Sequence, residues 1–128
     1  MTKENGKRIR PYLTADLEWI EPIAKRYGEW SSLLKALTFG LVGIVEEPYA
    51  MAALYQDMHG VALAGLAEED GIKPLIRLVI TLKNQAAEKG IALHGHWKPG
   101  SWQERLAVKH GFSIGGEGFH ILRTGTEN

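Results

Sequence analysis

The chain has 128 residues, of which 45% are hydrophobic and 23% are charged, and these values are typical of one folded domain with one core. The 15 Lys and Arg balance the 15 Asp and Glu, which argues against a general nucleic-acid binder because such a protein needs a basic surplus. The absence of cysteine excludes disulfides, a thiolate nucleophile and a cysteine-based zinc site, and no apolar run approaches the roughly 20 residues that a membrane helix needs.

The first predicted elements are a short strand and two helices. Pro11 in the strand weakens it unless it lies at an edge or an end of a sheet. Thr14 is a good N-cap for the first helix, and Pro22, about two turns in, is expected to kink or divide that helix. Ser31 or Ser32 can cap the second helix. The predicted ranges of these three elements are 8–13, 14–27 and 31–40.

Three apolar runs follow, at 41–47, 49–57 and 60–68, and turn residues separate them. This pattern favours an antiparallel meander of three strands. Alanine is frequent in these runs and is a weak strand former, so a helix over 49–57 is a rival interpretation.

The second half of the chain predicts a long helix, a strand, a short helix and a hairpin. Pro74 suits the first turn of the long helix, apolar residues then repeat at helical spacing, and Gly90 stops the helix. Ser101 and Glu104 have the spacing of a capping box at the start of the last helix. The strand, the last helix and the hairpin are expected at 91–97, 102–110 and 112–123. The glycines expected in the turn of the hairpin are Gly115, Gly116 and Gly118.

Taken in order, these elements predict an α/β fold with a mixed sheet (α+β). A strand and two helices are followed by three antiparallel strands, a helix, a strand, a helix and two strands. We expect one domain over residues 8–123 with flexible tails at 1–7 and 124–128. The polar N-terminus lacks the apolar core of a signal peptide, so we expect a cytoplasmic protein that associates with no membrane.

The segment GSWQERLAVKHGF at 100–112 resembles the helix after the fifth strand in GNAT acyltransferases, whose usual form is N-x-x-A-x-x-L-Y-x-K-x-G-F. Leu106, Lys109 and the final Gly111-Phe112 match this form. The positions that depart from it are Gly100, Gln103 and Ala107, the last of which stands where the family has a tyrosine. Together with the order of elements, the resemblance implies a GNAT-like fold over nearly the whole chain.

The resemblance implies that acetyl-CoA lies in a split between the fourth and fifth strands and that an amine accepts its acetyl group. The pyrophosphate would lie on the next turn, whose family pattern is Q/R-x-x-G-x-G/A. Of the three defined positions only Gly71 matches, because Glu68 and Lys73 occupy the other two. The cofactor-binding residues that the resemblance implies are Leu66, Ala67, Glu68, Gly71, Ile72 and Lys73.

Three carboxylates in a row stand at this turn: Glu68, Glu69 and Asp70. Backbone N–H groups at a helix N-terminus attract anions, and neighbouring acids oppose this attraction. Lys73 offsets part of the negative charge, whereas Pro74 removes one backbone donor. Either the turn still holds a phosphate, or the acids act as capping charges of their own helix.

His94 and His96 are the catalytic candidates, because GNAT enzymes commonly place a general base on the fourth or fifth strand. Alternation puts both side chains on one face of a strand, and imidazole accepts a proton at neutral pH. In the alternative interpretation both histidines are structural: one is a partly exposed sheet residue and the other is packed under Trp97. The pair also has a spacing that metal ligands use, but no metal is assigned because no spacing selects a third ligand. That ligand would come from an acid or from His59, His110 or His120.

Two functions from different classes follow. The first is a GNAT-like acyltransferase that moves an acetyl group from acetyl-CoA to an amine with a non-standard site. The second is a catalytically inactive GNAT-fold interaction module that binds a protein partner through Trp97, Trp102 and the acidic turn. Small GNAT-like proteins with a degenerate active site, including some encoded by tailed phages, resemble this chain. A homodimer is compatible with either function.

Overall fold

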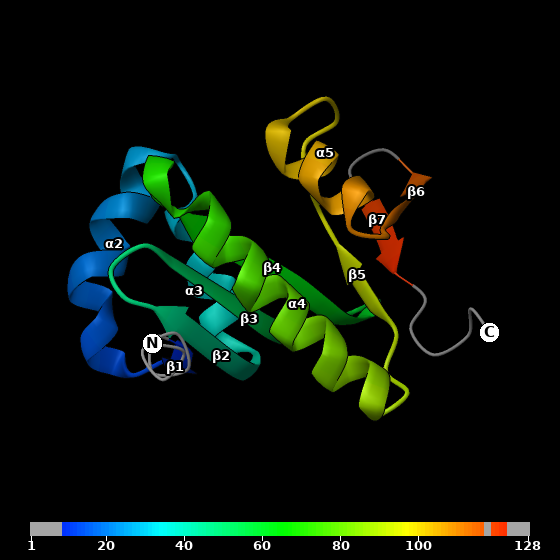
Figure 1. The fold of residues 1–128 in the computed structure, drawn as a ribbon, viewed down its shortest axis with the longest axis horizontal. Helices are drawn as coiled ribbons and strands as arrows, with labels where there is room; N and C mark the ends of the chain where they lie inside the picture. The colour runs from blue at the N-terminus through cyan, green and yellow to red at the C-terminus, as the bar shows by residue number, and fades with distance from the viewer. Residues whose placement is uncertain (1–8, 117–118, 123–128) are drawn as a thin grey trace.

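The computed structural model describes residues 9–116 and 119–122, and its helices and strands follow the predicted order (Figure 1). The strands are β1 (Ile9–Pro11), β2 (Gly40–Glu46), β3 (Ala50–Asp57), β4 (Gly60–Ala67), β5 (Leu93–Gly95), β6 (Ser113–Gly116) and β7 (Phe119–Leu122). The α-helices are α2 (Leu17–Arg26), α3 (Trp30–Thr38), α4 (Ile72–Glu88) and α5 (Trp102–Lys109), and the short 3-10 helices are η1 (Thr14–Asp16) and η2 (Glu69–Gly71). The expected tails at 1–7 and 124–128 lie outside the described residues.

Within the described residues, seven strands form one sheet in the order β1-β2-β3-β4-β5-β7-β6. Neighbouring strands are antiparallel except β4 and β5, which are parallel, so the sheet is mixed as expected. The ladder of β2, β3 and β4 confirms the predicted antiparallel meander. Pro11 lies in β1 at the edge of the sheet, which is the position where a strand tolerates proline.

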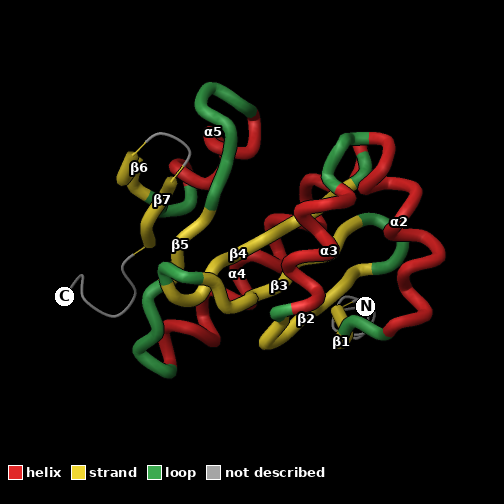
Figure 2. The backbone as a smooth tube through the Cα atoms, turned by 180° about the vertical axis from the view of Figure 1, so that it is seen from behind, coloured by secondary structure: helices red, strands yellow, loops and turns green. Residues whose placement is uncertain are grey.

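Helices cover both faces of the sheet. On one face, α4 packs against β2, β3, β4 and β5, and its Leu75, Leu78 and Leu82 lie in the shared core (Figure 1). On the other face, α2 and α3 cover a second core (Figure 2). Successive strand residues point to opposite faces, so Ile44 contributes to the first core and Val45 to the second.

Alanines fill both faces of β3, and the strand interpretation of this run is confirmed over the helical rival. Ala50 and Ala52 lie in the core under α4, Ala53 lies in the other core, and none is more than 1% exposed. Such small side chains leave room for helices on both faces of a central strand. Burial between two layers therefore overrides the weak strand propensity of alanine.

The start of the first helix differs from the prediction, because Thr14 is not its N-cap. Thr14 lies inside η1, and the carboxylate of Asp16 accepts the Leu13 N–H at 2.8 Å. Asp16 also accepts two hydrogen bonds from Arg10 and one from the indole of Trp19. This network fixes the tight turn before α2, and its bond from the Leu13 N–H to Asp16 is the N3 half of a capping box that begins at Leu13 rather than at Thr14.

Two further helix predictions are corrected. Pro22 is the sixth residue of α2, and the helix continues through it undivided. A proline removes one helical hydrogen bond, and the packing of α2 against the second core outweighs this loss. The N-cap of α3 is Glu29, so Ser31 and Ser32 lie in the first turn of the helix rather than at its cap.

The long helix α4 confirms the strongest element predicted from the sequence. Pro74 lies in its first turn, and Gly90, just beyond its end, has a φ of 69° that favours glycine. Leu78 of this helix is fully buried, and burial of such a side chain contributes about 1.5–3 kcal/mol to stability. Arg77 on the same helix donates two hydrogen bonds to the buried carboxylate of Glu46, which ties α4 to β2.

The start of α5 confirms Ser101 as the N-cap. Its hydroxyl accepts the Glu104 N–H at 3.2 Å, and the Glu104 carboxylate accepts the N–H of the residue before Ser101 at 2.8 Å. The reciprocal bond of the capping box is thus displaced by one residue. Gly115 and Gly116 lie within β6 rather than in the hairpin turn, and Gly118 falls outside the described residues.

Candidate functional site

The sheet splits between β4 and β5. These parallel strands pair only at Val61–Leu93 and Ala62–His94, near the start of β4. Beyond these pairs they diverge, as Figure 2 shows, and within the described residues the rest of β4 has only β3 as a strand neighbour. We call the region beside Ala62 and His94 the narrow end of the split, and the region at the end of β4 the wide end.

The residues expected to bind a cofactor gather at the wide end. Leu66 and Ala67 close β4, and each is 7% exposed because their side chains enter the two opposite cores. Their backbone groups are therefore what they present to the split. The first two residues of α4 are Ile72 and Lys73, and Lys73 is exposed. The N-terminus of a helix and one cation thus follow β4 directly.

Gly71 is required for packing inside the protein. A Cβ atom at this position would lie 2.3 Å from the carbonyl oxygen of Tyr49, a distance that side chains essentially never show. The same carbonyl accepts the Glu68 N–H at 3.0 Å. The turn therefore needs a glycine for its contact with the β2–β3 connection, whether or not a phosphate binds there.

The acids at the wide end have different surroundings. The N-cap of α4 is Gly71, which has no side chain, and Glu68 at the N-cap of η2 makes no capping hydrogen bond. Glu68 instead forms an ion pair with Arg26, with 2.6 Å between Oε1 and Nη1. Glu69 and Asp70 are exposed and, with Glu68, border a hollow of about 530 Å³ beside α2. Glu68 therefore makes an ion pair and no capping hydrogen bond, and the interpretation in which these acids act as capping charges of their own helix stays a prediction.

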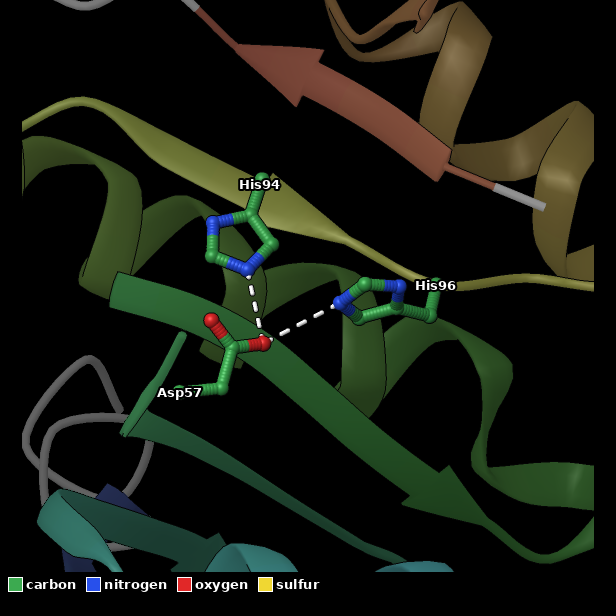
Figure 3. Close-up of side chains that lie close together, drawn as sticks. All are labelled: Asp57, His94 and His96. Carbon is green, nitrogen blue, oxygen red and sulfur yellow. Dashed lines mark hydrogen bonds and ion pairs between the residues drawn. The ribbon is translucent and has the colours of Figure 1, made fainter. Parts of the chain in front are cut away.

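A carboxylate and two imidazoles meet at the narrow end (Figure 3). Asp57 is the last residue of β3, His94 lies in β5, and His96 follows directly after β5. The Asp57 Oδ2 atom lies 2.9 Å from Nε2 of His94 and 3.1 Å from Nε2 of His96. Asp57 pairs with Gly60 across the hairpin, and Gly60 has no side chain to separate the carboxylate from β5.

The carboxylate of this cluster is stabilised in its charged form. Burial raises the pKa of Asp57, but hydrogen bonds from His94, the backbone N–H of His59 and His96 outweigh burial and lower the pKa to about 2. The His59 N–H donates to Oδ1 at 2.8 Å. His94 is 5% exposed, whereas the side chain of His96 is 41% exposed. The cluster therefore has an ionised, partly buried carboxylate and one side open to solvent.

This geometry permits two kinds of chemistry. A carboxylate that orients an imidazole favours proton transfer, and a carboxylate with two imidazoles is also a set of transition-metal ligands. The ligand atoms of Asp57, His94 and His96 all lie within 4.8 Å of one another. The sequence pointed to both histidines but not to Asp57, because only the strand order brings β3 and β5 together. The one local signal was that Asp57 precedes the turn at 58–60.

Trp97 packs on the opposite face of β5 from the two histidines. Its indole lies over Gly95, where a Cβ atom would meet the ring at 2.1 Å, and it contacts the Phe112 ring edge-on with 5.1 Å between ring centres. Trp97 thereby joins the core under α4. The prediction that one histidine is packed under Trp97 is wrong, because alternation sends His94 and Trp97 to opposite faces.

The remaining candidates have different surroundings. Of the two tryptophans expected to form a recognition surface, Trp102 is 40% exposed and Trp97 packs against a core. Ala107, which stands where the family has a tyrosine, is 8% exposed and lies in the core under α4. His110 follows the end of α5, and the side chain of His120 lies outside the described part of the structure.

Comparison with protein-family models and with curated proteins gives no family for this chain. No family model matches it, and no curated protein matches it. In the part of the chain that the structure describes, no helix is both long enough and apolar enough to cross a membrane. Any assignment of function therefore depends on the geometry of the split and of its two ends.

Proposed function

We propose that this protein is a GNAT-like acyltransferase that binds acetyl-CoA in the split and transfers its acetyl group to an amine. The split itself carries the proposal: β4 and β5 are parallel, share two residue pairs and then separate, and a helix N-terminus follows β4. Ligands of open α/β sheets bind in crevices at the carboxyl ends of strands. The resemblance of residues 100–112 to the GNAT helix supports the same family.

The backbone of β4 supplies the surface for the pantetheine arm of the cofactor. From Leu63 to Ala67, β4 pairs with β3 on one edge, and its other edge has no strand neighbour among the described residues. An open strand edge offers N–H and C=O groups in a row, and pantetheine contains amides that match them. We expect the arm to lie along β4 as an added strand does.

The phosphates of the cofactor would lie at the N-terminus of α4, beside Lys73. The partial positive charge of the helix and the lysine ammonium both favour an anion there. Glu69 and Asp70 oppose it: at about 6 Å and an effective dielectric of about 20, each costs a phosphate charge roughly 2–3 kcal/mol before solvent and salt screen the interaction. We therefore expect weak binding, with a Kd in the micromolar to millimolar range.

The proposed reaction is direct attack on the thioester. The amine nitrogen donates its lone pair to the carbonyl carbon, a tetrahedral intermediate forms, and the C–S bond breaks to give an amide and the CoA thiolate. The proton lost by the nitrogen passes through water to the thiolate sulfur. Ala107 cannot donate this proton to the thiolate, so we assign the transfer to water and expect slow turnover.

Calorimetric titration with acetyl-CoA and with CoA tests the cofactor site. We expect both to bind, and we expect Lys73→Glu to weaken binding about tenfold because it reverses the charge beside the phosphates. Lys89→Glu is the matched control, since it makes the same change at the other, exposed end of α4. No binding at millimolar cofactor, or equal effects of the two substitutions, would contradict the proposal.

A second function is favoured by two observations. The contact with Tyr49 explains Gly71 without a bound phosphate, and Ala107 stands where the family has its tyrosine. Neither residue is therefore evidence for catalysis. The protein would then be an inactive GNAT-fold module that binds a protein partner, with the exposed Trp102 in the recognition surface. Light scattering after size exclusion and pull-downs with wild type and Trp102→Ala test this function. Loss of a partner in the variant, with no cofactor binding by the wild type, would favour the module.

A further inference from the structure

The cluster at the narrow end has the composition of a metal site. We propose that Asp57, His94 and His96 bind Zn²⁺ and that the ion fastens β5 to the β3–β4 hairpin. Imidazole nitrogens and carboxylate oxygens are ligands that zinc takes in proteins. Carboxylates alone would suit Mg²⁺ or Ca²⁺, but two imidazoles select a transition metal.

The three side chains already converge on one point. Figure 3 shows both imidazoles directing Nε2 toward the same carboxylate oxygen of Asp57, at 2.9 Å for His94 and 3.1 Å for His96. In a tetrahedral zinc site with bonds of about 2.0–2.2 Å, neighbouring ligand atoms lie about 3.3–3.5 Å apart. Side-chain rotations that move the ligand atoms by on the order of 1 Å are therefore enough to admit the ion, and the strands stay in place.

Two of the three ligands are held firmly before the ion arrives. His94 is 5% exposed and lies in one of the residue pairs that join β4 to β5. The side chain of Asp57 is 11% exposed, and its Oδ1 accepts the backbone N–H of His59 at 2.8 Å. Hydrogen bonds of this kind orient metal ligands and raise metal affinity. Oδ2 is thereby left directed at the imidazoles.

His59 is the candidate for a fourth ligand. Its ring centre lies 5.8 Å from that of His94 and 6.1 Å from that of His96, and the latter two centres are 5.1 Å apart. Two imidazoles on one tetrahedral zinc ion have ring centres roughly 5 Å apart. His59 is exposed in the β3–β4 turn, so a small side-chain movement brings it to the same ion.

An ion at this place would strengthen the pairing of β4 with β5, which has the fewest residue pairs of the strand pairings that the structure describes. β4 and β5 share two residue pairs, whereas β3 and β4 share eight. The C-terminal strands β7 and β6 join the sheet through β5. The proposed ligands come from the β3–β4 hairpin and from β5, so the ion would link the two parts across β4. This role is structural, and it holds whether or not acetyl-CoA binds in the split.

Calorimetric titration of the metal-free full chain with Zn²⁺ tests the site, together with thermal unfolding. We expect one ion per chain, no binding of Mg²⁺, and a rise in Tm of about 5–10 °C at 100 times Kd. His96→Ala should weaken zinc binding at least about tenfold, and because His96 is exposed we expect this variant to fold. Asp57→Asn keeps the side-chain shape and is the second variant. His110→Ala removes a histidine outside the cluster and is the matched control.

Two results would overturn the proposal. One is a wild type that binds no zinc more tightly than about 100 μM, which is too weak to fasten a strand. The other is equal zinc binding by the His96→Ala and His110→Ala variants, because the ion would then be held elsewhere. Titration of acetyl-CoA into zinc-free protein is a separate measurement, so failure of the metal site and failure of the cofactor site are distinguishable.

Discussion

The two ends of the split are opposite in character. At the narrow end, the carboxylate of Asp57 is 11% exposed and holds two imidazoles at hydrogen-bonding distance. At the wide end, Glu69 and Asp70 are exposed beside a helix whose N-cap is a glycine. The groups at the narrow end come from strands far apart in the chain, whereas the groups at the wide end are sequence neighbours.

The contrast predicts which part of a bound cofactor each end of the split would contact. Its phosphates would meet acids at the wide end, and its acyl group would approach a preformed polar cluster at the narrow end. The wide end therefore limits affinity, because exposed charges act on the anion even after screening. The narrow end supplies a preformed set of ligand atoms, one carboxylate and two imidazoles, that suits a metal better than it suits a phosphate.

Gly71→Ala is expected to have the largest effect, a loss of about 2–3 kcal/mol in the free energy of unfolding. Its new Cβ atom would lie 2.3 Å from the Tyr49 carbonyl oxygen, so the turn at the wide end must shift. Urea unfolding measures the loss, with Lys73→Ala, an exposed neighbour, as the control. If the Gly71→Ala protein is as stable as the wild type, the contact with Tyr49 does not explain this glycine, and phosphate binding becomes the explanation.

Asp16 provides a reference for the partly buried carboxylate of the narrow end, because the main partner of Asp16 is an arginine. The hydrogen bonds from Arg10, aided by Leu13 and Trp19, lower the pKa of Asp16 to about 2 despite burial. The pKa of Asp16 in the folded protein is below its usual value of 3.8, so Asp16 stabilises the fold fully above the usual value, and this stabilisation is lost as the pH falls toward 2. The loss between pH 5 and pH 2 is expected to be about 2 kcal/mol.

The test is the free energy of unfolding of wild type and Asp16→Asn across that pH range. The variant should lack this part of the acid-dependent loss, so its curve should be flatter. Glu47→Gln is the control, since Glu47 is the exposed second partner of Arg10. Parallel curves for wild type and Asp16→Asn would show that Asp16 does not titrate as its hydrogen bonds require.

Reversing the charges of the acids at the wide end tests, through the affinity for CoA, whether these acids limit cofactor binding. The double variant Glu69→Lys, Asp70→Lys should bind CoA at least about tenfold more tightly than the wild type, because two repulsive charges become attractive. Calorimetry gives the Kd, and Glu88→Lys at the far end of α4 is the control. Equal affinity of the double variant and the wild type would place the phosphates elsewhere.

The smallest effect is expected at Glu68. Its ion pair with Arg26 has side chains that are 28% and 53% exposed, and surface ion pairs add little stability. Glu68→Gln should leave the midpoint of urea unfolding unchanged at physiological salt. A clear shift of the midpoint would mean that Glu68 has a structural role in the turn beyond this contact.

Most of the fold follows from local patterns in the sequence. Periodic apolar residues and glycine or proline boundaries predicted α4, and apolar runs separated by turn residues predicted the meander of β2, β3 and β4. The caps were predicted less well, because Asp16 bonds to the side chains of Arg10 and Trp19 and to the Leu13 N–H, and Thr14 lies inside η1 rather than at the expected N-cap. These partners are only three to six residues away, but a rule that looks for a Ser, Thr, Asp or Asn at the N-cap does not find them.

The candidate site was predicted only in part. The alternation of His94 and His96 places them on one face, and this is a local property of a strand. Their contact with Asp57 depends on β5 lying next to β4, a crossover that strand propensities do not encode. Gly71 was predicted as a phosphate-binding glycine, which stays a prediction, and its contact with Tyr49 was not predicted because the β2–β3 connection is remote in sequence.

A titration of isotope-labelled protein with acetyl-CoA, followed by amide NMR, tests binding in the split most directly. We predict saturable shifts concentrated on the backbone amides of Leu63 to Ala67 and on those of residues 71–73, with few changes in β1, β2 and α5. The contrary result is either no saturable shift at millimolar acetyl-CoA or shifts confined to a surface away from β4 and the start of α4.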